Sequence, residues 1–210
     1  MKDICFIVNP ISGGKDKSGI VASVRKHLDA SLYRPAFHFT ERAGEAETFA
    51  HDCRADIVVA VGGDGTVSEV ARGLVGTGKT LGIIPCGSGD GLALHLGISR
   101  TPAKAVKTLN EAAEARIDVA SLQDGLLDII AVRPFSTVEI PDLAARLMTG
   151  LAPTSRHFLH FSGSSFHISR AHAGAIHCDG DPFEGGTEFE LSVMKGALKV
   201  LVPSSRLNRL

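Results

Sequence analysis

The chain has 210 residues, 44% of them hydrophobic, and a formal charge of −1 at pH 7. This indicates one large domain or two small ones with a real core, and it argues against a basic surface for nucleic acid. The four cysteines are widely spaced with no Cys-x-x-Cys pair, which is typical of reduced thiols in a cytoplasmic protein. Since no run of about 18 apolar residues indicates a transmembrane helix, we expect any membrane contact to be peripheral.

The first part of the chain predicts alternating strands and helices. Residues 4–8 are an apolar run of strand length, followed by the glycine-rich turn Asn-Pro-Ile-Ser-Gly-Gly-Lys at 9–15. This turn indicates either a ligand site or an ordinary flexible loop. The next predicted elements are a helix over 18–29, a weak strand over 36–39 ending at Thr40, a helix over 45–53 and a strand over 56–61.

A second glycine-rich turn, Gly-Gly-Asp-Gly-Thr at 62–66, ends that strand. Glycine lets the backbone turn with positive φ and approach a ligand without a Cβ in the way. The helix expected over 66–74 directs unpaired N–H groups at the same place, which favours an anion such as phosphate. Because a bare carboxylate repels phosphate, Asp64 indicates a metal ion or a transferable proton between them. The alternative is a strand–helix turn with Asp64 as a capping residue.

A third such turn, Pro-Cys-Gly-Ser-Gly-Asp-Gly at 85–91, follows a strand predicted over 80–84. Helices over 92–96 and 102–113 and a strand over 116–119 complete the pattern. Residues 1–119 are therefore predicted to form an α/β domain with a doubly wound parallel sheet, in which the three turns gather at one edge. Three glycine-rich turns favour a nucleotide or another polyphosphate, although none of them matches a P-loop.

Residues 120–203 show the period-two alternation and short turns of a second, antiparallel β-rich domain. Strands are expected over 126–132, 157–161, 165–169, 188–194 and 198–202, the last two paired, with a helix over 141–149. The stretch from His172 through His177 to Asp179-Gly180-Asp181 is expected to be a polar turn. Together with His157, His160 and His167, these histidines match no zinc spacing, so we expect surface or packed histidines. The tail at 204–210 is expected to be frayed.

Taken in order, these motifs resemble the catalytic domain of diacylglycerol kinases and sphingosine kinases, which are lipid kinases related to the NAD kinases. The matching residues are Asn9-Pro10-x-Ser12-Gly13-Gly14, Thr40, Gly62-Gly63-Asp64-Gly65-Thr66-x-x-Glu69 and Pro85-x-Gly87-Ser88-Gly89. Residues 120–128, 179–181 and 198–203 also match, so the resemblance covers nearly the whole chain. It implies an NAD-kinase-like α/β nucleotide-binding domain joined to an antiparallel β-sandwich domain, with the active site in the cleft between them.

The resemblance also implies ATP and Mg²⁺ as cofactors. By residue match, ATP contacts Asn9, Pro10, Ile11, Ser12, Gly13, Thr40, Gly62, Gly63, Asp64, Gly65, Thr66, Val67, Ser68, Glu69 and Ser88. A structural Mg²⁺ is held by Ser121, Asp124 and the carbonyl of Leu126. Asp181 takes the position of the general base, with Asp179 and Asp64 close to the catalytic metal and the acceptor hydroxyl. The alternative for Asp179 and Asp181 is a β-turn with solvated acids.

The chain departs from the family pattern at three places. Asp181 stands where the family usually has Glu, and Asp90 stands where it usually has Asn. A charge at Asp90 weakens phosphate binding unless a cation covers it, although Asp90 caps a following helix as well as Asn does. Between Val119 and Ala120 the chain lacks several strands and a helical segment of the second domain. Either the segment was deleted, or the sequence omits it, in which case the intact mass lies well above 22.1 kDa.

The first function that these residues indicate is an ATP-dependent lipid kinase that phosphorylates a hydroxyl of diacylglycerol, a sphingoid base or a similar lipid. An NAD kinase-like enzyme shares the Gly-Gly-Asp turn, but the turn at 9–13 and the late Asp-Gly motif argue against it. A non-catalytic nucleotide-binding module is the third possibility. For a lipid kinase, we expect a cytoplasmic protein that docks peripherally on a membrane and binds no nucleic acid, with a homodimer as one option for its assembly.

Overall fold

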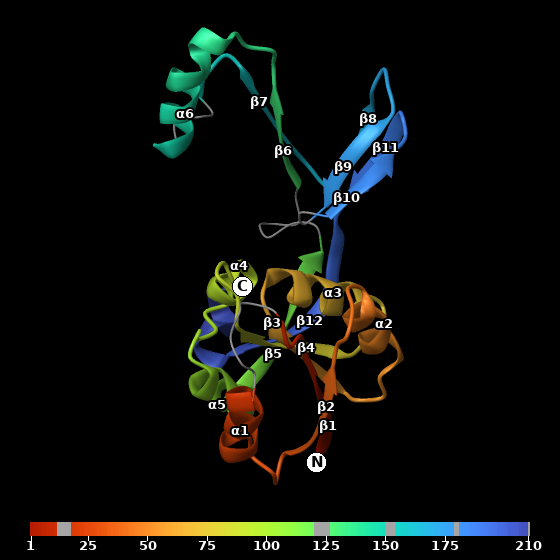
Figure 1. The fold of residues 1–210 in the computed structure, drawn as a ribbon, viewed down its shortest axis with the longest axis vertical. Helices are drawn as coiled ribbons and strands as arrows, with labels where there is room; N and C mark the ends of the chain where they lie inside the picture. Colours follow the sequence, from red (N-terminus) through yellow and green to blue (C-terminus); the bar gives the residue numbers. More distant parts are fainter. Residues whose placement is uncertain (12–17, 120–126, 150–153, 179–180, 210) are drawn as a thin grey trace. The chain divides into compact units, whose positions relative to one another are not determined.

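The computed structural model describes residues 1–11, 18–119, 127–149, 154–178 and 181–209 (Figure 1). The chain divides into two compact units. The first contains Met1–Ile117 and Gly196–Leu210, and the second contains Asp118–Lys195.

A six-stranded sheet forms the centre of the first unit, with the strand order β2-β1-β3-β4-β12-β5. The strands are β1 (Lys2–Val8), β2 (Tyr33–Phe39), β3 (Ile57–Gly62), β4 (Thr80–Pro85), β5 (Ala112–Val119) and β12 (Met194–Pro203). The pairs β1–β2, β1–β3, β3–β4 and β4–β12 are parallel. Every residue of β3 and β4 is buried, as expected for strands covered on both faces.

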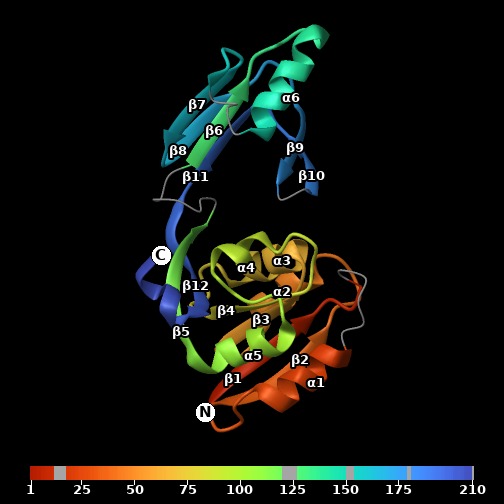
Figure 2. The ribbon, with the colours of Figure 1, turned by 90° about the vertical axis from the view of Figure 1, so that its left-hand side faces the viewer.

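Helices follow the first four strands and cover both faces of this sheet. They are α1 (Ser18–His27), α2 (Glu45–Asp52), α3 (Asp64–Leu74), α4 (Gly91–His95) and α5 (Pro102–Glu111). Helix α3 packs on β3, β4 and α2, whereas α5 packs on β4 and α1. Figure 2 shows α2 and α3 on one side of the sheet and α1 and α5 on the other. The α/β class with a mostly parallel sheet, predicted from the sequence, is therefore confirmed.

The last strand, β12, lies in a different place from the one predicted. We expected residues 198–202 to pair with 188–194 in the second domain, but β12 lies between β4 and β5, with Val200 opposite Leu81. The side chains of Val200, Leu201 and Val202 are consecutive and buried. This is expected for a strand that is covered on both faces, whereas a strand with one solvent-exposed face would alternate buried and exposed residues. The expected boundary of the second domain at residue 203 is therefore wrong, because Gly196 and the residues after it belong to the first unit.

The tail after β12 also differs from the expectation of a frayed end. Residues Ser204–Arg209 form a 3₁₀ helix, η4. The Ser204 hydroxyl donates a hydrogen bond to the Glu111 carbonyl, and Arg116 donates to the Gly196 carbonyl at 3.0 Å. The first contact attaches the tail to α5, and the second joins β12 to its neighbour β5.

The described residues of the second unit form three antiparallel strand pairs. They are β6 (Leu127–Val132) with β7 (Phe158–Gly163), β8 (Ser165–Ser169) with β11 (Glu188–Ser192), and β9 (Gly174–Cys178) with β10 (Asp181–Gly185). The 3₁₀ helix η2 (Thr137–Glu139) and helix α6 (Ile140–Met148) lie between β6 and β7 in the sequence. The antiparallel character was predicted. In the stretch that we expected to be a polar turn, however, Gly174–Cys178 form strand β9, and Asp181 begins its partner β10.

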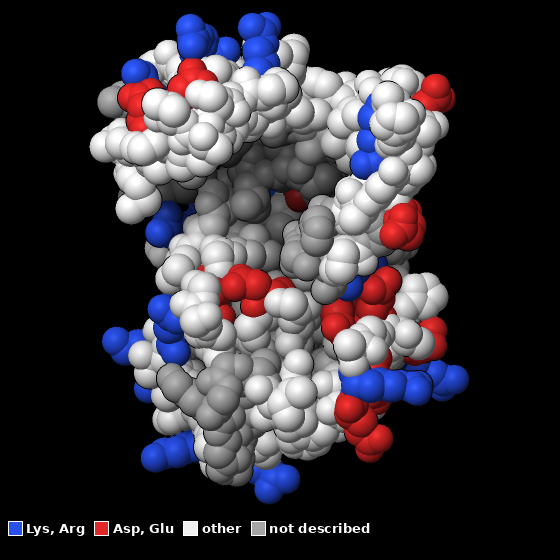
Figure 3. All heavy atoms as spheres, turned by 45° about the horizontal axis from the view of Figure 1, so that its top comes forward, with Lys and Arg blue, Asp and Glu red and all other residues white. Residues whose placement is uncertain are grey.

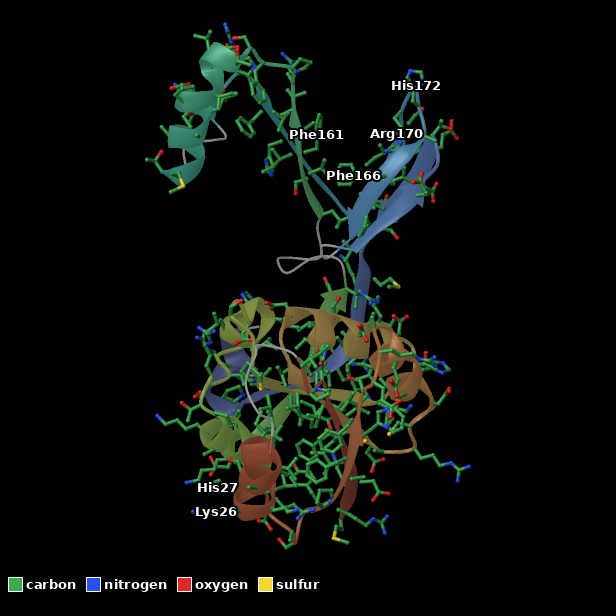
Figure 4. The ribbon with its side chains drawn as sticks, viewed as in Figure 1. Lys26, His27, Phe161, Phe166, Arg170 and His172 are labelled. Atoms are coloured by element: carbon green, nitrogen blue, oxygen red, sulfur yellow. The ribbon has the colours of Figure 1, made fainter. Side chains whose placement is uncertain are left out.

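Arg170 connects the strand pairs of this unit. Its guanidinium donates hydrogen bonds to the carbonyls of Gly174, Gly185 and Gly186, and it lies 5.6 Å from the ring centroid of Phe189. Figure 4 shows Arg170 beyond the end of β8, with His172 further out. These hydrogen bonds satisfy backbone carbonyls where the strands β9 and β10 begin and end.

Glu139 fixes the start of η2, the turn that leads directly into α6. Its carboxylate accepts hydrogen bonds from the Ser136 backbone N–H at 2.8 Å and from the Ser136 hydroxyl at 3.0 Å. It also pairs with Arg156 at 2.9 Å and His157 at 3.0 Å. The Ser136 N–H, followed by Arg156, lowers the pKa of Glu139 from its ordinary 4.5 to about 2.

Because the pKa of Glu139 is lower in the folded state, its carboxylate stabilises the fold above pH 4.5, and this contribution disappears as the pH falls towards 2. Glu139→Gln has no carboxylate to protonate at this position. We therefore expect the stability of the variant to fall less than that of the wild type between pH 4.5 and 2. Hydrogen exchange of the α6 amides at several pH values measures this. Glu184→Gln, an exposed acid of the same unit, is the matched control. An unchanged acid profile for Glu139→Gln contradicts the prediction.

Candidate functional site

The second and third glycine-rich turns lie against each other at the ends of neighbouring strands. Gly62 is opposite Pro85 in the β3–β4 register, and the Cys86 N–H donates to the Gly62 carbonyl at 2.8 Å. A Cβ on Gly87 would lie 2.8 Å from the Cα of Gly63, which is closer than real Cβ contacts. The two backbones therefore approach to a distance that only glycine permits.

Asp64 connects these two turns through its carboxylate. Oδ2 accepts a hydrogen bond from the Asp90 N–H at 2.9 Å, and Oδ1 accepts one from the Gly91 N–H at 2.8 Å. We considered Asp64 as a cap of the helix that follows it, but its carboxylate instead holds the start of α4. Each carboxylate oxygen has a second lone pair, so Asp64 keeps acceptor capacity for a ligand or a cation.

The first turn is joined to the second through Asn9 and Thr66. The Asn9 side-chain amide lies 3.3 Å from the Thr66 hydroxyl, and Asn9 Oδ1 accepts a hydrogen bond from the Ile11 N–H at 3.1 Å. A Cβ on Gly62 would lie 2.3 Å from the Thr66 hydroxyl, so glycine at this position makes room for Thr66. The N–H of Thr40 donates to the Val8 carbonyl, which places Thr40 beside the end of β1.

Two pockets open where these turns meet. The larger has a volume of about 860 Å³, and it is lined by Gly63, Asp64, Gly65, Cys86, Gly87, Ser88 and Arg100. The smaller has a volume of about 330 Å³, and it is lined by Asn9, Pro10, Ile11, Thr40, Glu41, Arg42, Ala43, Ala46, Thr66 and Glu69. Both contain residues from the first two turns of α3. The first intrahelical bond there joins the Val67 N–H to the Gly63 carbonyl, so the N–H groups at positions 64–66 precede the helix ladder.

The negative charge of Asp90, which by itself would weaken phosphate binding, is compensated by a cation beside it. Its side chain is 2% exposed, and it pairs with Arg100 Nε at 3.2 Å. Oδ1 of Asp90 also accepts a hydrogen bond from the Gly87 N–H at 2.8 Å. Asp90 is the one non-glycine residue with positive φ in the described part of the chain, at 54°, and its side chain does not cap α4. Its carboxylate instead closes the third turn.

The structure gathers most of the expected nucleotide contacts at the two pockets. Those that line a pocket are Asn9, Pro10, Ile11, Thr40, Gly63, Asp64, Gly65, Thr66, Glu69 and Ser88. Gly62, Val67 and Ser68 line neither. Val67 is 7% exposed and its N–H is bonded within the helix, so it presents no polar group to a ligand. The Ser68 hydroxyl accepts a hydrogen bond from Arg72.

The remaining expected site residues lie outside the described residues. Ser12 and Gly13 of the first turn, Ser121, Asp124 and Leu126 of the expected structural metal site, and Asp179 are among them. For Asp181 the backbone is described as the first residue of β10, whereas its side chain is not. The junction of Val119 with Ala120 also borders this undescribed stretch.

Sequence reasoning missed Arg100, Cys86 and Gly87 as pocket residues. Gly87 belonged to the recognised motif but had no assigned role. Arg100 lies ten residues after Asp90, in the loop before α5, and a single arginine in a loop gives no sequence signal. The acid at Asp90, where the family usually has Asn, was the available clue, since a negative charge beside a phosphate site requires a cation nearby.

No group of three or more His, Cys, Asp or Glu side chains suited to a metal occurs among the described residues. His157 pairs with Glu139, and His167 lies 3.8 Å from Glu190. These contacts agree with surface and packed histidines. The side chain of His177 is not described.

The contact between Gly63 and Gly87 can be tested by adding one methyl group. We expect Gly87→Ala to lower the free energy of unfolding by roughly 1–3 kcal/mol, because overpacking displaces both turns. Gly91→Ala is the control, since its Cβ would meet only the Asp64 carboxylate, at 3.8 Å. This control should change the stability by less than about 0.5 kcal/mol. Urea denaturation measures the free energy of unfolding of both variants. Equal values for Gly87→Ala and Gly91→Ala contradict a tight contact between Gly63 and Gly87.

Residues 3–122 match the family described as the diacylglycerol kinase catalytic domain. A diacylglycerol kinase of Bacillus subtilis (strain 168) is 30% identical over 218 residues, which cover 99% of this chain and 71% of that protein. A diacylglycerol kinase of Staphylococcus haemolyticus is 37% identical over 43% of this chain and 30% of that protein. A YegS-like lipid kinase of Klebsiella pneumoniae is 36% identical over 40% of this chain and 30% of that protein.

Solved structures show the same fold. The crystal structure of a diacylglycerol kinase from Bacillus anthracis strain Sterne has a TM-score of 0.75 at 17% identity, over 97% of this chain and 98% of that chain. Two further structures from the same organism give TM-scores of 0.77 and 0.80 at the same identity.

Proposed function

Because the chain belongs to the diacylglycerol kinase catalytic-domain family, a family of lipid phosphotransferases, we propose that it transfers the γ-phosphoryl group of ATP to a lipid hydroxyl. The acceptor class is diacylglycerol, a sphingoid base or a similar lipid. The observation that carries the proposal is the meeting of two glycine-rich turns, together with residues 9–11 of the first turn, around two pockets at the ends of β1, β3 and β4. Ligands bind at this edge of open α/β sheets.

The first unit supplies the groups that a nucleotide requires. Phosphoryl transfer needs hydrogen-bond donors around the phosphates, because its transition state is stabilised mainly by positioning and electrostatics. The N–H groups at the start of α3, which has eleven residues, lie at the larger pocket and suit an anion. The side chains of Asn9, Thr40, Thr66 and Glu69 around the smaller pocket suit a polar part of the same nucleotide.

The proton of the acceptor hydroxyl requires a carboxylate within hydrogen-bond reach. We assign this role to Asp181 and place Asp179 and Asp64 near the reacting groups, on the family resemblance. Asp64 is well suited, because its two backbone hydrogen bonds orient the carboxylate and leave lone pairs open.

Mg²⁺ is part of the proposal. Magnesium is commonly bound by one or two carboxylates together with substrate phosphates and water, and not by an all-protein cage. Asp64, at the edge of the larger pocket, fits such a site as a single carboxylate ligand. Bound there, the ion would neutralise phosphate charge. A second, structural Mg²⁺ is proposed at Ser121, Asp124 and Leu126.

A lipid acceptor requires contact with a membrane surface. In the described part of the chain, no helix combines the length and apolar character that a membrane span requires. On the face that Figure 3 shows, Lys and Arg side chains stand in separate small groups among Asp and Glu. Exposed apolar side chains of the second unit include Val138, Ile140 and Met148. We propose peripheral docking of a cytoplasmic protein; a homodimer is compatible with this function.

Labelled ATP separates the candidate functions. The full chain is incubated with γ-³²P-ATP and Mg²⁺, and diacylglycerol, sphingosine and NAD are offered in separate reactions. We expect label in the organic extract of one of the lipid reactions. Label in NADP instead supports an NAD kinase-like enzyme, which shares the Gly-Gly-Asp turn. ATP binding without transfer to any acceptor supports a non-catalytic nucleotide module and overturns the kinase proposal.

The general base is tested by Asp181→Asn. We expect turnover to fall about 10²–10⁴-fold, because the variant lacks a proton acceptor, while ATP binding stays unchanged. Asp142→Asn is the control, since Asp142 pairs with Arg146 on α6. Initial rates and calorimetric titration with ATP measure the two effects. Near-normal turnover with tight ATP binding in Asp181→Asn contradicts the assignment.

A further inference from the structure

Arg100 lies at the larger pocket and makes three contacts with one short turn. Its Nη2 group donates hydrogen bonds to the carbonyls of Gly87 and Ser88, each at 2.9 Å. Its Nε group pairs with the buried carboxylate of Asp90 at 3.2 Å. The other oxygen of that carboxylate accepts from the Gly87 N–H. Arg100 and Asp90 together therefore hold the whole turn from Gly87 to Asp90.

The hydrogen bonds from Arg100 determine the direction of the peptide groups in this turn. In a planar trans peptide the C=O and the following N–H point in opposite directions. The described chain contains no cis peptide bond. Since the carbonyls of Gly87 and Ser88 both face the Arg100 guanidinium, the N–H groups of Ser88 and Gly89 face away from it.

These two N–H groups are available to a ligand. Within the described ranges, neither the Ser88 N–H nor the Gly89 N–H has a hydrogen-bond acceptor in the protein. Both residues are exposed. Two successive N–H groups held in a turn form a concave site that binds anions. The neighbouring N–H groups of Gly87, Asp90 and Gly91, in contrast, are all occupied by carboxylates.

We propose that Arg100 is the positioning residue of a phosphate site: it turns the Gly87 and Ser88 carbonyls aside, so that the Ser88 and Gly89 N–H groups bind the triphosphate of the nucleotide. The inference rests on the proposed function, because it adds a residue to the same nucleotide site. Asp90 has the supporting role of fixing Arg100 and of closing the turn. The arginine side chain is 49% exposed, so the pair is not a sealed core contact but lies at the pocket surface.

The planar shape of the guanidinium matters for this role. Arginine presents several donors in a rigid fork, so it can hold two carbonyls and a carboxylate at once. Lysine carries the same charge as a single flexible ammonium and does not reproduce this arrangement. A comparison of the two residues therefore separates the positioning of the turn from the simple presence of a positive charge.

The test is calorimetric titration of the full chain with two probes, ATP and inorganic tripolyphosphate, each with Mg²⁺. We expect Arg100→Gln to weaken both probes by a similar factor of about 10–100, because charge-assisted hydrogen bonds that organise the turn are lost. Arg100→Lys should recover less than half of this loss on a logarithmic scale. Arg34→Gln is the control, since Arg34 forms an ion pair with Asp3 on β1, outside both pockets.

A second measurement does not depend on the variants folding. In ¹⁵N-labelled wild-type protein, saturating tripolyphosphate should shift the Ser88 and Gly89 amide resonances more than that of Gly76, which lies in the loop after α3. Unmoved Ser88 and Gly89 resonances overturn the inference.

The outcomes distinguish this inference from the proposed function. Wild-type protein that binds neither probe overturns both. Wild-type binding with equal affinity in Arg100→Gln overturns only the role of Arg100. Full recovery in Arg100→Lys shows that charge alone suffices, and it likewise overturns the positioning role.

Discussion

The site depends on the close approach of two backbones where β3 and β4 end. Gly63 and Gly87 leave no room for a Cβ between them, and the Asp64 carboxylate then bridges to the N–H groups of Asp90 and Gly91. A larger residue at either glycine separates the turns, and a neutral side chain at position 64 leaves two N–H groups without a charged acceptor. The shape of the larger pocket and the direction of its free amides both follow from this contact. The two glycines are therefore packing residues, whatever the pocket binds.

The sequence predicted the architecture of the first unit well, for a physical reason. Its central strands β1, β3 and β4 are short apolar runs that are almost wholly buried. Each of them is followed by a turn motif, so the local sequence preference and the position in the fold agree. Helix and strand boundaries were right to within a few residues for most of these elements. The placement of β12 was not predictable in the same way, because the partner of a strand is decided by long-range pairing. The consecutive apolar residues Val200, Leu201 and Val202, which are all buried, were the indication that β12 belongs to a sheet covered on both faces.

In the candidate site, the location of the turns was predictable, whereas the partners of their polar side chains were not. The three turns and their convergence followed from the glycine pattern and from the rule that parallel strands end at one edge. What the sequence did not provide was the partner of each polar group. Asp64 holds α4 and not its own helix, and Asp90 is neutralised by an arginine ten residues away. Val67 lies within the motif but faces the core, because a helix presents only one side to the pocket. Side-chain partners across loops leave no periodic signal.

The position of β12 has a consequence for how the protein is made. The strand between β4 and β5 leaves the ribosome after both of them, so β5 lacks this sheet neighbour until some eighty residues of the second unit have been synthesised. The sheet of the first unit is completed by a contact of very long sequence separation, and such contacts form slowly because a large loop must close first. Until then, the exposed edge of β4 is open to non-native strand pairing. The second unit is thus an insertion between strands of a single sheet.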